Sequence, residues 1–398
     1  MAILKGNNLA SVIVRRSSSA AVVLLAGAAF AGLSAQGAGA AETRSFAVSW
    51  FYPAIYSQAD NCPNGLNPLS HDIFMRALTS TGKTPTEAEA IIEGVVEGTP
   101  AQRDASGKQI SERGTFAGAR VNAYENPLTV PDPGFTTAVG RFAYGFNLDG
   151  QGGKSAKQFE DPETHEKGVD NGLFRLYGCL ANHQAPPGTE PNYPLETWES
   201  IRDTMPAWVL SITGDNLSKD GDVTVTVDRA INNVLRDAHG HTRHDQTFQI
   251  DPDPRSHNTF KGKIKDGMLT AQMSKLYLLG DQFFLTEFDL TKAQIRLTMK
   301  QDGAAEGFIG GYMKWLPLYF QHAGNGLNAE TFRGLDIVGL YYALQRLADA
   351  DPDPVTKKNK RLSSTWHVEI VPAFLIPADR PGDTQAQADP IIQTSRAQ

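Results

Sequence analysis

The sequence predicts an α+β protein that is mainly β, with sandwich-like antiparallel sheets in the middle and a C-terminal helix packed on them. From Trp208 onward, apolar and polar residues alternate in several short segments, as in strands with one buried face. Apolar residues of helical spacing then follow as far as Leu347. An all-β barrel with decorating helices is the alternative, because short strands separated by Gly and Asp turns suit either architecture.

The N-terminal half carries clearer start signals for helices than for strands. The segment Ser45–Tyr56 predicts a strand, and Ser70 can begin a short helix that ends near Leu78. Thr84-Pro85-Thr86-Glu87 is a capping box with proline in the first turn, so it predicts a second helix. Residues 100–135 are polar with few periodic apolar positions and predict a long loop. Arg141–Leu148 predicts a further strand.

The second half supplies most of the predicted sheet. Val223, Val225 and Val227 alternate with threonines, so one face of that strand is apolar. Asn328 can cap the C-terminal helix, which we expect to run to Leu347. The expected strands are Ala207–Thr213, Asp222–Asp228, Thr259–Lys265, Leu276–Leu279, Phe283–Phe288, Ala293–Lys300, Gly307–Met313 and Thr365–Phe374.

The first forty residues predict a cleaved signal peptide. Lys5, Arg15 and Arg16 precede an apolar run, Ala20–Leu33, and the small-residue sequence Ala38-Gly39-Ala40 follows. We therefore expect a bacterial protein that is periplasmic or secreted. The arginine pair leaves the twin-arginine route open, but three serines stand where that signal needs a bulky apolar residue, which favours Sec export.

The rest of the chain predicts one large globular domain over residues 41–376, with a subdivision near residue 200 as the alternative. Residues 377–398 are rich in Asp, Gln and Ala and predict a disordered tail. No segment after the signal is long and apolar enough to predict a membrane span. The net charge of -7 argues against nucleic acid as a partner, because nucleic-acid binding needs an excess of Lys and Arg. A small molecule, a glycan or an envelope protein remains as a partner class.

Cys62 and Cys179 are the only two cysteines, and an even count in an exported chain predicts a disulfide. If the two are joined, their Cα atoms should lie about 4.4–6.8 Å apart. Two buried free thiols are the alternative.

A Gly-rich acidic stretch before Cys179 predicts a candidate calcium site. Asp149, Asp161, Asp170 and Asn171 bring together the oxygen ligands that calcium prefers. We expect Asp149, Asp170 and Asn171 to lie close together, with Asp161 nearby. Carboxylates held that closely need compensation by a cation or by hydrogen-bond donors. The alternative is a solvated turn whose Asp and Asn side chains bond their own backbone.

His239, His241 and His244 form a second candidate metal site. Their spacing resembles the H-x-H-x-D-H motif of the metallo-β-lactamase superfamily, which implies a zinc ion and hydrolase activity. The resemblance covers these six residues, and Arg243 stands where the family has its aspartate. We therefore expect a histidine-rich hairpin loop and no catalytic zinc at this position.

No pattern in the sequence assigns catalytic residues. A G-x-S-x-G nucleophile motif is absent, and the abundant carboxylates cannot be paired from sequence. The sequence therefore favours an exported ligand-binding or envelope-associated protein, with calcium as a candidate stabilising ion. An exported hydrolase, either metal-dependent or carboxylate-based, is the alternative. A hydrolase should bring His, Asp or Glu together in a deep pocket, whereas a binding module should present a shallow face with aromatic side chains.

Overall fold

The computed structural model describes residues 41–152, 158–185, 191, 202–280 and 287–378. The predicted signal peptide and nearly all of the predicted tail lie outside the described residues. Among the helices of these ranges, none combines the length and the hydropathy that crossing a lipid bilayer requires.

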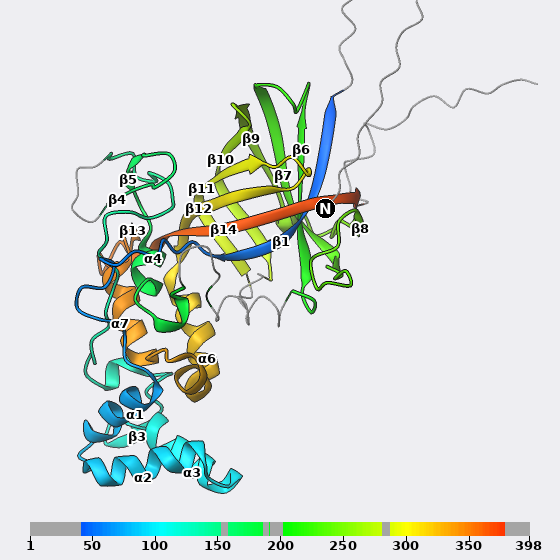
Figure 1. Cartoon of the computed structure of the whole chain (residues 1–398). Helices are drawn as coiled ribbons and strands as arrows, with labels where there is room; N and C mark the ends of the chain where they lie inside the picture. Colours follow the sequence, from blue (N-terminus) through cyan, green and yellow to red (C-terminus); the bar gives the residue numbers. More distant parts are fainter. Residues whose placement is uncertain (1–40, 153–157, 186–190, 192–201, 281–286, 379–398) are drawn as a thin grey trace, which may run out of the picture. The chain divides into compact units, whose positions relative to one another are not determined.

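A closed antiparallel barrel forms the centre of the fold (Figure 1). Within the described ranges, eight strands pair in the order β1, β6, β7, β9, β10, β11, β12 and β14, and β14 returns to pair with β1. The predicted sandwich is therefore wrong, and the alternative barrel is the observed architecture. Alternation predicts a buried and a wet face, but it does not say whether a sheet closes on itself. The strands are β1 (Glu42–Pro53), β6 (Pro206–Gly214), β7 (Gly221–Asn233), β9 (His257–Lys265), β10 (Met268–Leu279), β11 (Glu287–Met299), β12 (Ala305–Lys314) and β14 (Asn359–Ile376).

Aromatic side chains fill the barrel interior. The ring of Phe51 stacks on Trp366 and meets Trp208 edge-on, with centroid separations of 4.9 Å in both cases. Phe288 contacts the same rings, and each of the four side chains is at most 1% exposed. Val223, Val225 and Val227 face this core, as their alternation predicts. Side chains therefore fill this part of the interior, as in other small barrels.

Helices pack beyond one end of the barrel strands (Figure 1). Helices α4, α6 and α7 contact β14, and α1 contacts α6. The capping box at Thr84 and Glu87 is confirmed at the start of α2. The helices are α1 (Ser70–Thr79), α2 (Pro85–Val96), α3 (Pro100–Ser111), α4 (Gly172–Tyr177), α6 (Trp315–Arg333) and α7 (Ile337–Leu347).

The long loop predicted for residues 100–135 is wrong in its first part. Helix α3 occupies Pro100–Ser111, and a short hairpin of β2 (Gly114–Phe116) and β3 (Ala119–Val121) follows. Thr99 and Gln102 form a capping box that the polar composition hides. The helix has almost no apolar face, because Ile110 is its one large buried apolar residue, so helical periodicity could not predict it.

The predicted C-terminal helix is in fact two helices. Gly334 ends α6 in the left-handed conformation at φ 57°, and Asp336 then caps α7 by accepting the backbone N–H of Gly339. The strand predicted for Arg141–Leu148 is also wrong, because this segment makes only isolated bridges at Phe142 and Phe146. The remaining short strands are β4 (Phe159–Glu160), β5 (Lys167–Val169), β8 (Gln246–Gln249) and β13 (Ala350–Pro352).

A buried carboxyl group ties the helices together. Glu330 on α6 is fully buried, accepts the hydroxyl of Tyr124 at 2.5 Å and accepts the backbone N–H of Ile337 at 3.1 Å. The guanidinium of Arg113 lies 3.6 Å away. Burial raises the pKa of Glu330 to about 7, although Arg113 opposes that rise.

Candidate functional site

The outer face of the barrel presents two rows of side chains across three neighbouring strands. Trp50 on β1 lies opposite Glu369 on β14, which in turn lies opposite Glu306 on β12. Two residues further along the three strands, the second row consists of Tyr52, His367 and Phe308. Cross-strand partners of this kind have side chains within contact distance, so the register alone brings aromatic, acidic and imidazole groups together.

A bulge in β1 creates this arrangement. The pairing with β14 shifts by one residue between Val48 and Trp50. Val48 and Phe51 therefore both face the core, whereas Trp50 and Tyr52 lie opposite the outward residues of β14. Without the bulge, a period of two would place Trp50 and Tyr52 on the core side with Val48.

The loop segments 144–152 and 158–170 cover part of this face, and a buried ion pair holds them there. Arg296 on β11 donates to Asp161 at 2.6 Å, and the two side chains are only 7% and 0% exposed. The guanidinium also lies 5.3 Å from the ring centroid of Phe146 and 5.2 Å from that of Phe308. Gly310 on β12 permits the close approach, because a Cβ there would overlap the Phe146 ring.

Asp161 is well compensated in this position. It accepts the backbone N–H groups of Gly145, Glu163 and Thr164 in addition to Arg296. Burial alone would raise the pKa of Asp161, but the Thr164 N–H and the Arg296 guanidinium lower it below its usual value. The loop is therefore fixed by charge pairing as well as by packing.

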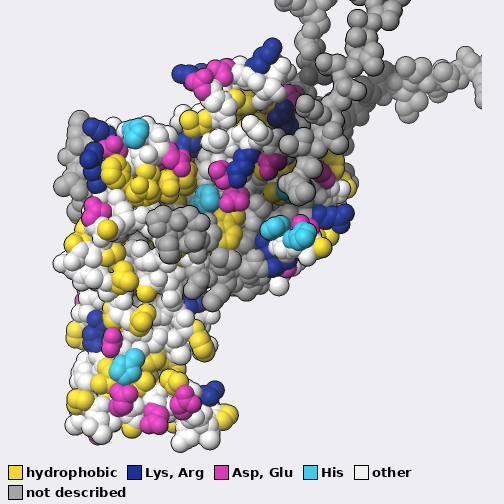
Figure 2. Space-filling view, viewed as in Figure 1, with side chains coloured by type: hydrophobic (Ala, Val, Ile, Leu, Met, Phe, Trp, Pro, Cys, Tyr) yellow, Lys and Arg dark blue, Asp and Glu magenta, His cyan; other side chains and the backbone are white. Residues whose placement is uncertain are grey.

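Between this loop and the barrel lies a cleft of about 880 Å³. Its aromatic lining consists of Trp50, Tyr52, Tyr56, Tyr144 and Phe308. Tyr144 stacks on Phe308 with centroids 4.7 Å apart, and Tyr56 meets Tyr144 edge-on at 5.4 Å. Its polar lining includes Glu163, Arg296, Thr298, Glu306 and His367. In the region of β12 and β14, Figure 2 shows hydrophobic side chains gathered beside acidic and histidine side chains.

A second groove of about 1080 Å³ adjoins the cleft at Thr164, Met268 and Arg296. Its other side chains come mainly from the polar outer faces of β7, β9 and β10, with Lys261 and Lys263 among them. It has one aromatic side chain, Phe146, in its lining. The smaller cleft is therefore the better candidate, because apolar rings and a few convergent polar groups characterise ligand sites.

Glu306, His367 and Glu369 converge beside the cleft. One donor atom from each lies within 4.8 Å of the others, and all three side chains are partly buried. Burial lowers the pKa of His367 to about 4, so its imidazole is neutral at pH 7. Burial raises the pKa of Glu369, and the nearby Glu306 adds to that rise while Lys300 opposes it. The ammonium of Lys300 lies 2.5 Å from Glu306.

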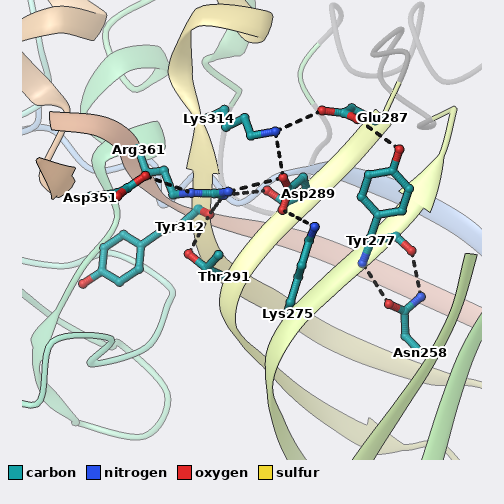
Figure 3. Close-up of polar contacts among 10 residues, drawn as sticks. All are labelled: Asn258, Lys275, Tyr277, Glu287, Asp289, Thr291, Tyr312, Lys314, Asp351 and Arg361. Carbon is teal, nitrogen blue, oxygen red and sulfur yellow. Dashed lines mark hydrogen bonds and ion pairs between the residues drawn. The ribbon is translucent and has the colours of Figure 1, made fainter. Parts of the chain in front are cut away.

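A different charged cluster on the same barrel has a structural role. Figure 3 shows Asp289 between Lys275, Lys314 and Arg361, at 3.8, 3.0 and 3.3 Å. Lys314 also pairs with Glu287, and Arg361 lies 3.9 Å from Asp351. Lys360 also lies 3.6 Å from Asp351, so four cations face three carboxylates, and these contacts join β10, β11, β12, β13 and β14. The cluster therefore has no surplus of negative charge that would attract a metal ion.

The predicted disulfide is confirmed. Cys62 and Cys179 are joined, and their Cα atoms lie 5.8 Å apart. The bridge connects the segment after β1 to the end of α4.

The acidic residues predicted as calcium ligands divide between two places. Asp149 and Asp170 lie together, because the Asp170 carboxylate accepts the backbone N–H groups of Leu148 and Asp149 at 2.9 and 3.1 Å. Asn171 caps α4 and donates to the carbonyl of Tyr144. Asp161 instead belongs to the Arg296 pair. In the described part of the chain, these acids are not among the convergent groups of metal-binding type, and calcium binding here stays a prediction.

His239, His241 and His244 lie in the turn region between β7 and β8. The carboxylate of Asp237 accepts the backbone N–H groups of His239 and His241 at 2.8 and 3.0 Å. The ring centroids of these two histidines lie 6.4 Å apart, and the His241 side chain is 81% exposed. This is the geometry of an exposed hairpin turn.

Sequence reasoning missed Glu306, His367 and Glu369. The predicted strand Thr365–Phe374 already places His367 and Glu369 on one face, which is a usable signal. Their meeting with Glu306 depends on the pairing register of β12 with β14, which the alternation does not specify. The chain matches no known family model, no curated protein and no solved structure, so these residues and their geometry carry the functional argument.

Proposed function

We propose that the protein is an exported ligand-binding protein whose outer cleft holds a glycan. The observation that carries this proposal is the aromatic lining of the cleft by Trp50, Tyr52, Tyr56, Tyr144 and Phe308. Sugar rings have apolar faces and hydroxyl edges, so they suit a site with aromatic rings and a few hydrogen-bonding groups. The disulfide supports export, because such bonds persist in oxidising compartments.

The charges of the cleft favour a neutral or amino sugar over an acidic one. Glu163 and Glu306 both line the cleft, whereas its cation Arg296 is already paired with Asp161. A uronic acid would therefore meet carboxylates without a free cation among the described lining residues. N-acetylated and neutral hexose oligosaccharides are the expected ligands.

The test is a glycan array with the full chain, followed by titration of each bound oligosaccharide and of a matched oligouronate. We expect Tyr144→Ala and Tyr56→Ala each to weaken binding about tenfold, since each removes a ring of the lining. Phe332→Ala is the matched control, because that ring is 78% exposed on α6 and outside the cleft lining. Equal loss in the control, or a preference of the metal-free protein for oligouronates, would contradict the proposal.

One observation favours the alternative of a hydrolase, namely the convergence of Glu306, His367 and Glu369 beside the same cleft. An enzyme that cleaves its glycan would release new reducing ends over time, whereas a binding protein returns the oligosaccharide intact. The same array ligands, incubated with the protein and assayed for reducing ends, separate these two functions.

A further inference from the structure

Two paired strands hold one imidazole and two carboxylates in fixed positions. Glu306 lies directly opposite Glu369 in the register of β12 with β14, and His367 is two residues from Glu369 on the same face. Their donor atoms lie within 4.8 Å of one another. The positions come from the backbone of a closed barrel, which is a more rigid support than a loop.

The cluster carries more negative than positive charge. Among the described residues, Lys300 is the cation in contact with these two carboxylates, and it pairs with Glu306. Around Asp289 in Figure 3, by contrast, the three cations Lys275, Lys314 and Arg361 face a single carboxylate. Two carboxylates within such a short distance favour the binding of an additional positive charge.

We propose that Glu306, His367 and Glu369 bind a divalent transition-metal ion of the zinc class. Zinc accepts imidazole nitrogen together with carboxylate oxygen, whereas calcium selects sites made of oxygen alone. Bonds of about 2.0–2.2 Å would bring the three donors to roughly 3.4 Å from one another, which side-chain rotation from the present separation can supply. With three protein ligands, the ion keeps a coordination position for water or a ligand.

The site and the cleft are contiguous, and Lys300 acts as the counter-ion of the metal-free form. Glu306 and His367 line the cleft, so a ligand there can reach the ion. Metal binding at Glu306 displaces the Lys300 ammonium that now contacts it. The metal therefore competes with one ion pair, and removal of that cation should strengthen metal binding.

The first experiment titrates the full chain, freed of metal by chelator, with ZnCl₂ in a calorimeter. One zinc ion per chain is expected, and CaCl₂ should bind more weakly. His367→Gln and Glu369→Gln should each weaken zinc binding at least about tenfold. His241→Ala is the matched control, because it removes an exposed histidine of the β7–β8 turn region and should leave the affinity unchanged.

The second experiment uses Lys300→Met, which keeps the side-chain length and removes the competing charge. Zinc binding should tighten by up to about fivefold, and circular dichroism of each metal-free variant checks that the barrel is intact. The proposal is wrong if zinc binding is lost in His241→Ala but kept in His367→Gln, or if Lys300→Met weakens it or leaves it unchanged. These outcomes are independent of glycan binding, because the titration contains no sugar.

Discussion

At the scale of single residues, Glu330 links the stability of the helices to pH. It is fully buried among Tyr124, Arg113 and the N-terminus of α7, and its pKa is raised to about 7. At pH values between the ordinary pKa of 4.5 and the raised pKa of about 7, this carboxyl group is ionised in the unfolded chain but protonated in the folded chain. The stabilising contribution is therefore fully present below pH 4.5 and is lost as the pH rises through about 7.

We expect Glu330→Gln to remove this pH dependence. The free energy of unfolding of the wild type, relative to that of the variant, should fall by about 3 kcal/mol between pH 4 and pH 8. Urea unfolding at a series of pH values measures the two curves, and their difference isolates this carboxyl from the other titrating groups. Parallel curves would show that Glu330 is ionised in the folded protein throughout.

Single residues also show how far sequence reasoning reaches. The pairing of Cys62 with Cys179 follows from composition and compartment, because no alternative partner exists in the chain. The outward position of Trp50 cannot be predicted from composition or alternation, because it depends on the β-bulge that adds one residue to β1. A bulge changes the face on which a side chain lies without changing the local composition. The alternation that begins with Phe46 and Val48 therefore predicts the wrong face for the later residues of β1.

At the scale of elements, one buried ion pair helps to hold the loop segments 144–152 and 158–170 against the barrel. Arg296 and Asp161 are nearly inaccessible to solvent, and the pair fixes the loop that carries Tyr144 into the cleft. Loss of one partner leaves the other charge buried with backbone hydrogen bonds but without an opposite charge, which costs more than the pair itself contributes. The loop and the cleft should therefore respond together to a change in either residue.

We expect Arg296→Met to lower the free energy of unfolding by about 3–5 kcal/mol, while the double variant Arg296→Met with Asp161→Asn should recover part of that loss. Chemical denaturation of the wild type, both single variants and the double variant gives the coupling energy of the pair. Strictly additive effects would mean that the two charges do not stabilise each other.

Elements with a strong apolar period were predictable, whereas elements whose only signals lie at their ends were missed. The strand β7 has three valines in alternation, and the predicted Asp222–Asp228 covers its first part, although β7 runs from Gly221 to Asn233. Helix α3 has no apolar stripe, and its only strong signal is the Thr99–Gln102 capping box. The break between α6 and α7 depends on Gly334 and Asp336, which a continuous helical period of apolar residues conceals.

At the scale of the whole molecule, the Cys62–Cys179 bridge restrains a long stretch of chain. The two cysteines are separated by 117 positions, and between them lie α1, α2, α3 and the loop that covers the cleft. A cross-link over such a distance reduces the conformational freedom of the unfolded chain, which raises the stability of the folded state.

We expect replacement of both cysteines by alanine to lower the free energy of unfolding by about 2–5 kcal/mol. Treatment of the wild type with a reductant should produce a similar loss, and the same reductant should leave the double variant unchanged. Thermal denaturation with and without reductant makes the comparison. A wild-type melting temperature that is insensitive to complete reduction would contradict the prediction.

The closure of the barrel by β1 and β14 also has a consequence for how the protein reaches its folded state. These two strands are the first and the last of the barrel along the chain, and they pair along most of β1. Until β14 emerges from the ribosome or crosses the membrane, β1 lacks one neighbour and β12 exposes an unpaired edge. We therefore expect the barrel to close only once β14 is available, so that the unfinished sheet keeps two open edges until then.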